Sequence, residues 1–281
     1  MTFAGLYTPL ITPFKENRLD EEGLIANIKR QEEAGVSGLV LFGTTAEAQT
    51  LSSPEQERIL EIARDSSLPL IIGCNEASTQ RVVERVSRLK NVQGLMISAP
   101  CYIRPTQDGL YQHFAAAAGA TDLPIIIYNN PVRAAVNIEP CTLERLAKIE
   151  NIVALKECHA AQASASALNL LCGNDDAILS MMAIGAQGAI AATANIIPRE
   201  MVAFVKACLE GDFEIARQWH YRLLPLFQMG GWESNPIPCK AAMNLMGFAA
   251  GEPRLPLLRC TKEKEIEEVL WKLGFLVAPG R

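Results

Sequence analysis

The sequence has few of the features that bind nucleic acid, metals or membranes. Its 281 residues carry a net charge of −5 without a basic cluster, which argues against nucleic acid as a partner. It has only three histidines, and none lies at metal-ligand spacing from a cysteine, so no metal site is expected. Apolar runs stay shorter than about 18 residues and no basic leader precedes one, which predicts a cytosolic protein without membrane contact.

The eight cysteines also lack a disulfide or zinc pattern. There is no C-x-x-C pair, and Cys74 and Cys172 are among the cysteines that lie inside apolar runs. A thiol in such surroundings packs as a small apolar group. We therefore expect reduced, mostly buried cysteines in a reducing compartment.

Short β-branched runs alternate with amphipathic segments, which indicates repeated strand–helix units. Leu70-Ile71-Ile72 and Ile125-Ile126-Ile127 are continuous apolar runs, as expected for parallel strands buried on both faces. The predicted strands are Gly5–Ile11, Gly38–Phe42, Pro69–Cys74, Gly94–Ser98, Pro124–Tyr128, Ile152–Lys156, Leu170–Cys172 and Gly188–Ala192.

Capping signals bound several of the predicted helices. Asp20 is the expected N-cap of Glu21–Ala34, which Gly35 can end in the left-handed conformation. Ser53-Pro54-Glu55-Gln56 places proline at the first helical position and glutamine at the capping-box position of the next helix, which runs to about Asp65. Further helices are predicted over Thr79–Lys90, Asp108–Ala120, Thr142–Ile149 and Pro198–Leu209.

Eight such units predict a (β/α)8 TIM barrel over residues 1–211. An open doubly wound sheet fits less well, because no G-x-G-x-x-G turn follows the first strand. Residues 212–281 show no further strand signal and predict a C-terminal helical extension packed on the barrel. Its helices are expected near Phe213–Phe227, Pro238–Gly247 and Lys262–Leu273.

Reactive groups of such barrels lie at the C-terminal ends of the strands, and Lys156 closes the apolar strand Ile152–Lys156. A lysine attacks carbonyl carbon only as the neutral amine, and apolar walls disfavour the charged ammonium. On position alone, a solvated lysine at a strand edge is the competing interpretation. In the context of a barrel, a nucleophilic lysine and a solvated lysine are about equally expected at this position.

Other strand ends carry a possible proton-transfer group and possible anion-binding groups. Tyr128 ends the fifth strand and could transfer protons where no histidine is available, although a core tyrosine with a bonded hydroxyl is common. Thr44 and Thr45 offer hydroxyls in a G-T-T turn, for which a helix-capping loop is an equal explanation. Arg133 could bind a carboxylate in bidentate fashion, or simply be solvated.

Together these segments resemble the dihydrodipicolinate synthase / N-acetylneuraminate lyase family of pyruvate aldolases. The resemblance extends from near residue 5 to near residue 260, with the motifs in family order. The matching segments are Gly43-Thr44-Thr45-Ala46-Glu47, Tyr128-Asn129-Asn130-Pro131, Ala154-Leu155-Lys156-Glu157, Gly173-Asn174-Asp175, Thr193-Ala194-Asn195 and Asn235-Pro236-Ile237-Pro238-Cys239-Lys240.

The resemblance implies an imine between Lys156 and pyruvate, which becomes an enamine and attacks an aldehyde. It implies that Tyr128 is the proton shuttle and that Thr45 links it to Tyr102, which reaches in from a neighbouring subunit. A homodimer or homotetramer is therefore expected. No cofactor is implied, and the sequence has no phosphate-binding turn of the kind that a pyridoxal-phosphate enzyme would need.

The same resemblance implies where the two substrates bind. Thr44 and Thr45 would hold the pyruvate carboxylate, and Gly173 and the Ile190 carbonyl would lie near the imine. Arg133 resembles the synthase branch of the family, in which the guanidinium binds the carboxylate of L-aspartate-4-semialdehyde. The expected product is 4-hydroxy-tetrahydrodipicolinate, a precursor of diaminopimelate and lysine.

Two alternatives remain open. A sister aldolase or lyase would act on N-acetylneuraminate or a 2-keto-3-deoxy sugar acid, and would favour small or hydroxyl-bearing residues in place of Arg133. A non-catalytic barrel would serve in binding or assembly. The joint presence of Lys156, Tyr128 and Thr45 counts against the second alternative.

The chain departs from the family pattern beside the expected site, at Ala46, Ala48, Cys101 and Ile103. These changes leave room for a sister activity. Where lysine-inhibited members carry a serine, histidines, a glutamate and a tyrosine, this chain has Ala48, Ser53, Gln56, Thr79 and Cys101, and it keeps only Asn75. We therefore expect weak or absent feedback inhibition by lysine.

Overall fold

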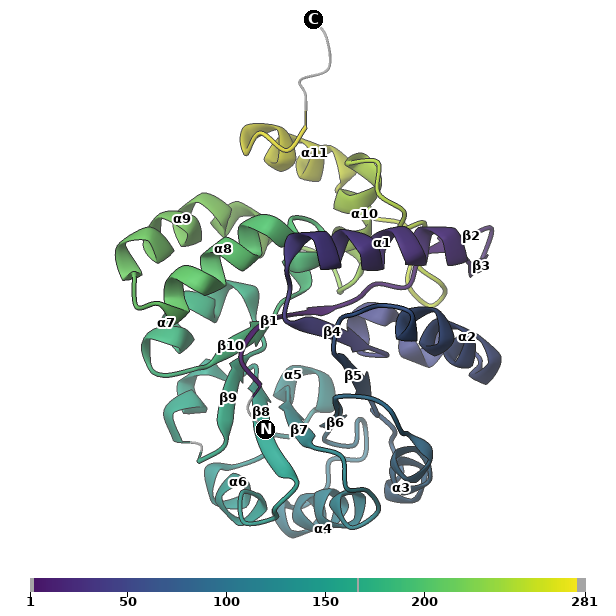
Figure 1. Cartoon of the computed structure of the whole chain (residues 1–281), viewed down its shortest axis with the longest axis vertical. Helices are drawn as coiled ribbons and strands as arrows, with labels where there is room; N and C mark the ends of the chain where they lie inside the picture. Colours follow the sequence, from purple (N-terminus) through teal and green to yellow (C-terminus); the bar gives the residue numbers. More distant parts are fainter. Residues whose placement is uncertain (1–2, 166, 277–281) are drawn as a thin grey trace, which may run out of the picture.

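The computed structural model describes residues 3–165 and 167–276, and eight parallel strands form a closed barrel surrounded by helices (Figure 1). The (β/α)8 prediction is confirmed, and the hydrogen-bonded order is β1-β10-β9-β8-β7-β6-β5-β4. The strands are β1 (Gly5–Pro9), β4 (Gly38–Leu41), β5 (Leu70–Gly73), β6 (Gly94–Ser98), β7 (Ile125–Asn129), β8 (Ile152–Glu157), β9 (Asn169–Cys172) and β10 (Gly188–Ile190).

The continuous apolar runs are explained by two separate cores. In β7, Ile126 faces the barrel interior, whereas Ile125 and Ile127 pack in the layer between strands and helices. Because successive side chains of a strand point to opposite faces, a strand buried on both sides needs apolar residues at every position. The interior cluster comprises Phe3, Tyr7, Val40, Ile71, Met96, Ile126, Tyr128, Ala154, Leu171 and Ile190.

Two glycines allow the barrel to close between its first and last strands. A Cβ on Gly188 would lie 2.1 Å from the Gly5 carbonyl oxygen, far inside van der Waals contact. Gly5 itself has a φ of 91°, a backbone conformation that side chains disfavour. The close pairing of β1 with β10 therefore depends on the absence of both side chains.

The predicted barrel helices are present, with small differences at their ends. Asp20 accepts a hydrogen bond from the Gly23 amide, and Gly35 ends the first helix with a φ of 77°, both as predicted. The capping box of the second helix was predicted one residue too late, because Ser52 and Glu55 form it. The helices are α1 (Glu21–Ala34), α2 (Ser53–Arg64), α3 (Thr79–Arg88), α4 (Gln107–Ala118), α6 (Pro140–Leu146), α7 (Ile178–Ala183) and α8 (Pro198–Leu209).

Some short elements were not predicted. A two-stranded hairpin, β2 (Phe14–Lys15) and β3 (Arg18–Leu19), follows β1, and strands of two residues are too short for a periodic signal. The described connection from β8 to β9 contains a 3-10 segment, Ala160–Ala165, where a regular strand–helix unit would place an α-helix. The two strand–helix units around β9 are therefore the least regular of the barrel.

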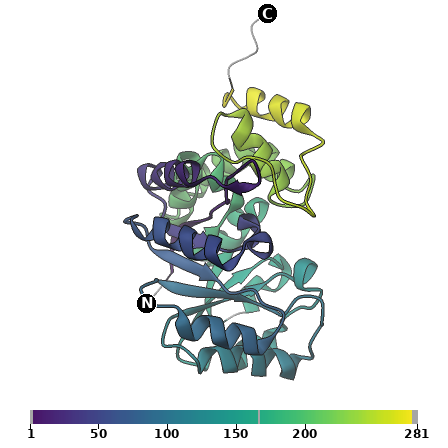
Figure 2. The same ribbon diagram turned by 90° about the vertical axis from the view of Figure 1, so that its right-hand side faces the viewer.

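Between residues 212 and 276 the chain contains the expected helices, α9 (Phe213–Met229), α10 (Ile237–Leu245) and α11 (Glu263–Lys272). α9 packs on α8, while α10 and α11 pack together and lie at one end of the molecule, beside the barrel (Figure 2). Lys240 of α10 forms a buried ion pair with Glu47 at 2.7 Å, in the loop after β4. We propose the division into residues 1–211 and 212–281, in which this ion pair attaches the second part to the first.

Across residues 3–165 and 167–276, each helix is either too short or too polar to cross a bilayer.

Candidate active site

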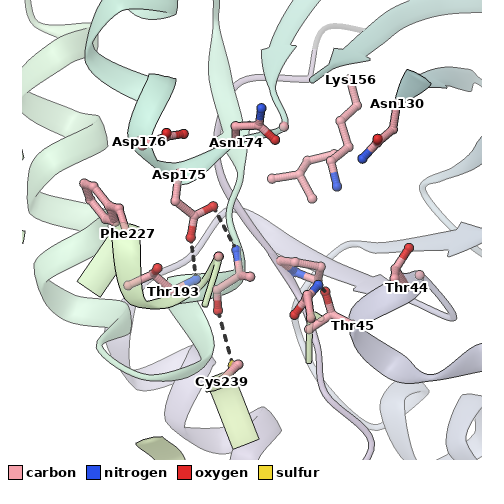
Figure 3. Close-up of a pocket in the computed structure, with 18 of the residues that line it drawn as sticks. Thr44, Thr45, Asn130, Lys156, Asn174, Asp175, Asp176, Thr193, Phe227 and Cys239 are labelled. Atoms are coloured by element: carbon pink, nitrogen blue, oxygen red, sulfur yellow. Dashed lines mark hydrogen bonds between the residues drawn. The ribbon is translucent and has the colours of Figure 1, made fainter. Parts of the chain in front are cut away.

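A cavity of about 340 Å³ lies at the C-terminal ends of the strands (Figure 3). Seven of the eight predicted site residues line it, and they come from the ends of different strands and the loops that follow. This is the face of a β/α barrel at which catalytic groups are placed. The seven are Thr44, Thr45, Tyr128, Arg133, Lys156, Gly173 and Ile190.

Lys156 projects from the end of β8 into this cavity (Figure 3). Its side chain is 6% exposed, and Nζ lies 4.4 Å from the ring centre of Tyr128. Among the described residues, no carboxylate lies within ion-pair distance of Nζ. The amine therefore lies beside an aromatic ring and forms no salt bridge with a described residue.

Two asparagines donate hydrogen bonds to hydroxyl groups of residues that line the cavity. Asn130 Nδ2 donates to the Tyr128 hydroxyl at 3.0 Å, and Asn235 Nδ2 donates to Thr45 Oγ1 at 2.9 Å. Both hydroxyl oxygens thus accept an amide hydrogen bond, which limits the directions in which their own protons can point. Within the described ranges no hydrogen bond joins Thr45 directly to Tyr128.

Arg133 and Thr44 occupy the open rim of the cavity. Arg133 lies in the short helix α5 (Pro131–Ala134), whose N-cap is Asn130. Its side chain is exposed, and no carboxylate partner is found for it in the part of the chain that the structure describes. A free guanidinium at the mouth of a cavity can bind an incoming carboxylate without first breaking an ion pair.

Asp175 lies on the wall opposite Lys156 and Asn130 (Figure 3). Its two carboxylate oxygens accept hydrogen bonds from the Ala192 amide at 3.2 Å and the Thr193 amide at 2.7 Å. Burial raises the pKa of this carboxyl, while these hydrogen bonds oppose the shift. Asp175 thereby fixes the turn after β10, which carries Ile190.

A buried carboxylate next to the lysine holds the ends of two neighbouring strands together. Glu157 is fully buried and accepts hydrogen bonds from Asn129 Nδ2 at 2.9 Å, the His159 amide at 2.6 Å and Gln162 Nε2 at 3.1 Å. Burial raises its pKa, and these donors oppose the shift. Since its donors come from β7 and from the loop after β8, Glu157 ties the ends of both strands together.

Tyr102 is the predicted site residue that the single chain does not bring to the cavity. Its side chain is 92% exposed and its φ is 73°. It lies in the loop after β6, next to the exposed residues Cys101 and Ile103. Within the described residues of one chain, Tyr102 is therefore exposed and does not line the cavity with Thr45.

Several lining residues received no role from the sequence. The motifs contain Asn130 and Asn235 without giving them a role, and no sequence signal points to the α9 residues Leu226 and Phe227 as part of a site. The sequence motifs alone do not show that Asn235 contacts Thr45, because 190 positions separate the two residues. The only indication in the sequence that this loop has a defined conformation is the pair of prolines, Pro236 and Pro238, that follows Asn235.

The described residues contain no group of three or more histidine, cysteine, aspartate or glutamate side chains that could hold an ion.

The packing around Gly173 gives a test of how tightly the lysine is held. A Cβ at this position would lie 2.4 Å from Cys158 Sγ and 3.2 Å from Lys156 Cε. We expect Gly173→Ala to displace the lysine stem and lower kcat/KM roughly ten- to a hundredfold in steady-state assays. Cys158→Ala in the same chain should restore part of the activity, because it removes the nearest clash.

Gly231→Ala is the matched control, since it lines the same cavity but a Cβ there would meet its nearest atom at 3.5 Å. Its kinetics should stay close to those of the unchanged protein. Unchanged kinetics in Gly173→Ala would show that the packing at Gly173 does not confine the Lys156 side chain.

Comparison with known proteins agrees with the geometry. Residues 2–270 match the sequence profile described as the Dihydrodipicolinate synthetase family. A relative from Methanocaldococcus jannaschii is named 4-hydroxy-tetrahydrodipicolinate synthase. It is 41% identical over an alignment of 288 positions, gaps included, which covers 98% of this chain and 100% of that protein.

Solved structures give the same result. A crystal structure described as dihydrodipicolinate synthase has a TM-score of 0.94 at 41% identity, over 98% of this chain and 100% of the other. A chloride-inhibited dihydrodipicolinate synthase from Acinetobacter baumannii, complexed with pyruvate, has a TM-score of 0.92 at 31% identity, over 98% and 100% of the two chains. The chain therefore belongs to the dihydrodipicolinate synthetase family.

Proposed function

We propose that this protein is a 4-hydroxy-tetrahydrodipicolinate synthase, which condenses pyruvate with L-aspartate-4-semialdehyde through a Schiff base on Lys156. The observation that carries the proposal is the position of Lys156 at the end of β8, inside a cavity that also contains Tyr128, Thr44, Thr45 and Arg133. Full-length relatives with this name and a pyruvate complex of a structural neighbour support it.

In the proposed reaction, the neutral Lys156 amine attacks the keto carbon of pyruvate and water leaves, which forms an imine. Loss of a methyl proton then gives an enamine, whose carbon attacks the aldehyde. The imine acts as an electron sink, so that a free carbanion never forms. Tyr128 is placed to move the protons, since its ring lies against the lysine amine.

The two substrate carboxylates are assigned to different groups of the cavity. Thr44 and the adjacent Thr45 supply hydroxyls for the pyruvate carboxylate, and the Ile190 carbonyl lies near the imine. Arg133 at the rim would bind the carboxylate of the aldehyde substrate, because it is exposed to the cavity mouth and has no acidic partner among the described residues. Gly173 leaves room for the lysine stem.

The test is turnover with pyruvate and different aldehydes. We expect product with L-aspartate-4-semialdehyde and none with N-acetylmannosamine. The reverse preference would place the protein with the sister aldolases that act on sugar-derived substrates, and would contradict the assignment of Arg133.

Feedback by lysine is expected to be weak or absent. The one matching residue, Asn75, already uses its side-chain amide within the fold, since it donates to the Phe42 carbonyl at 3.4 Å and accepts from the Ser98 amide at 3.2 Å. Initial rates should therefore be unchanged by lysine at micromolar concentration. An inhibition constant in the micromolar range would contradict this expectation.

We also propose that the working form is a homodimer or homotetramer in a reducing compartment such as the cytosol. The exposure of Tyr102, with Ile103 beside it 60% exposed, supports a subunit contact at the loop after β6. All eight cysteines are free, which supports the choice of compartment.

A further inference from the structure

Asn130 lies between the proposed proton shuttle and the proposed carboxylate-binding arginine. It directly follows β7 and is the N-cap of α5, and Figure 3 shows its side chain beside Lys156. Its Oδ1 accepts a hydrogen bond from the Arg133 backbone amide at 3.2 Å, and its Nδ2 donates to the Tyr128 hydroxyl at 3.0 Å. One side chain thus contacts both parts of the site.

The orientation of the Asn130 amide follows from these two partners. A backbone N–H can only donate, so the carbonyl oxygen of the asparagine must face Arg133. The NH₂ group must then face Tyr128, and the phenol oxygen must accept. As a result, the phenol proton points away from the turn between β7 and α5. The Cys158 thiol also contacts this hydroxyl, and burial raises the pKa of that thiol, which keeps it neutral.

We propose that Asn130 is a positioning residue that fixes the direction of the Tyr128 hydroxyl and stabilises the phenol oxygen while its proton is being transferred. A hydrogen bond to an oxygen that gains negative charge is about twice as strong as one to a neutral oxygen. The contact is therefore strongest in the transition state, which is where an interaction accelerates a reaction. The inference rests on the proposed role of Tyr128.

The backbone around Asn130 is held independently of its side chain. The preceding residue, Asn129, donates to the buried Glu157 carboxylate at 2.9 Å and to Asn137 Oδ1 at 2.9 Å. Its Oδ1 accepts from the Ile138 amide at 3.1 Å. Replacement of the Asn130 side chain should therefore leave the course of the chain intact.

Two variants separate the roles of the side chain. Serine is a good N-cap, so Asn130→Ser keeps an acceptor for the Arg133 amide, but it is too short to reach the Tyr128 hydroxyl. Asn130→Ala loses both contacts. We expect Asn130→Ser to fold with an unchanged Tm and to lower kcat roughly tenfold, with KM for pyruvate changed less than about twofold.

The solvent isotope effect on kcat gives a readout that a purely structural role would not move. It should increase in Asn130→Ser, because proton transfer becomes slower relative to the other steps. A wild-type kcat and isotope effect in Asn130→Ser would overturn the inference. The inference would also be overturned if Asn130→Ser and Asn130→Ala both had a lower Tm and the loss of activity in each variant matched its loss of stability.

Borohydride trapping of pyruvate separates this inference from the proposed function. We expect both the wild-type protein and Asn130→Ser to form the adduct on Lys156, with slower formation in the variant. Failure of the wild-type protein to form it would contradict the proposed function, and the inference with it. A wild-type adduct together with unchanged kinetics in Asn130→Ser would contradict the inference alone.

Discussion

Lys156→Ala is expected to lower kcat at least a thousandfold with pyruvate and L-aspartate-4-semialdehyde. The alanine side chain cannot form the imine, so the covalent route is lost, and loss of a nucleophile has effects on this scale or larger. Lys156→Arg should be equally inactive, because a guanidinium stays protonated and does not attack a carbonyl. Steady-state rates of the purified variants provide the measurement.

The control for this variant is Lys206→Ala, since Lys206 lies on the surface of α8 with its side chain 70% exposed. It should keep the kcat of the unchanged protein. Lys156→Ala should also keep a similar Tm, because Lys156 has no ion-pair partner among the described residues that its removal would leave unpaired. Activity in Lys156→Ala within tenfold of wild type would refute the covalent mechanism.

Tyr128→Phe is expected to lower kcat by about a hundred- to ten-thousandfold, the range typical for loss of a general acid–base group. The ring that packs against Lys156 remains, and only the hydroxyl is removed. Since the ring keeps its place, we expect KM for pyruvate to change far less than kcat. Separate measurement of kcat and of KM for each substrate would show whether the loss lies in kcat.

Tyr7→Phe is the matched control for the loss of a phenol. Tyr7 belongs to the same interior cluster as Tyr128, but it is not among the residues that line the cavity. Its kcat should be close to that of the unchanged protein. Equal losses in both variants would indicate that damage to the barrel interior, rather than loss of proton transfer, explains the result at Tyr128.

The barrel could be predicted from the sequence because its strands are buried on both faces. Runs such as Ile125-Ile126-Ile127 leave no polar position, and each predicted strand overlaps the strand found. Lys156 could be identified because it is a charged residue at the end of such an apolar strand. Its position at the C-terminal end of β8 then follows from the fold.

Contacts between distant segments could not be predicted in the same way. The contact of Asn235 with Thr45 and the ion pair of Lys240 with Glu47 depend on how the C-terminal helices pack on the barrel. Periodicity carries no information about such docking. The hydrogen bond of Asn130 with the Tyr128 hydroxyl depends on the sharp turn after β7, which motif letters do not describe.

The central claim is that Lys156 is the amine that binds pyruvate. The most direct measurement is reduction with borohydride in the presence of pyruvate, followed by digestion and mass spectrometry of the peptides. The account predicts one reduced pyruvate adduct per chain, located on Lys156. An adduct on any other lysine, or no adduct at all, would contradict it.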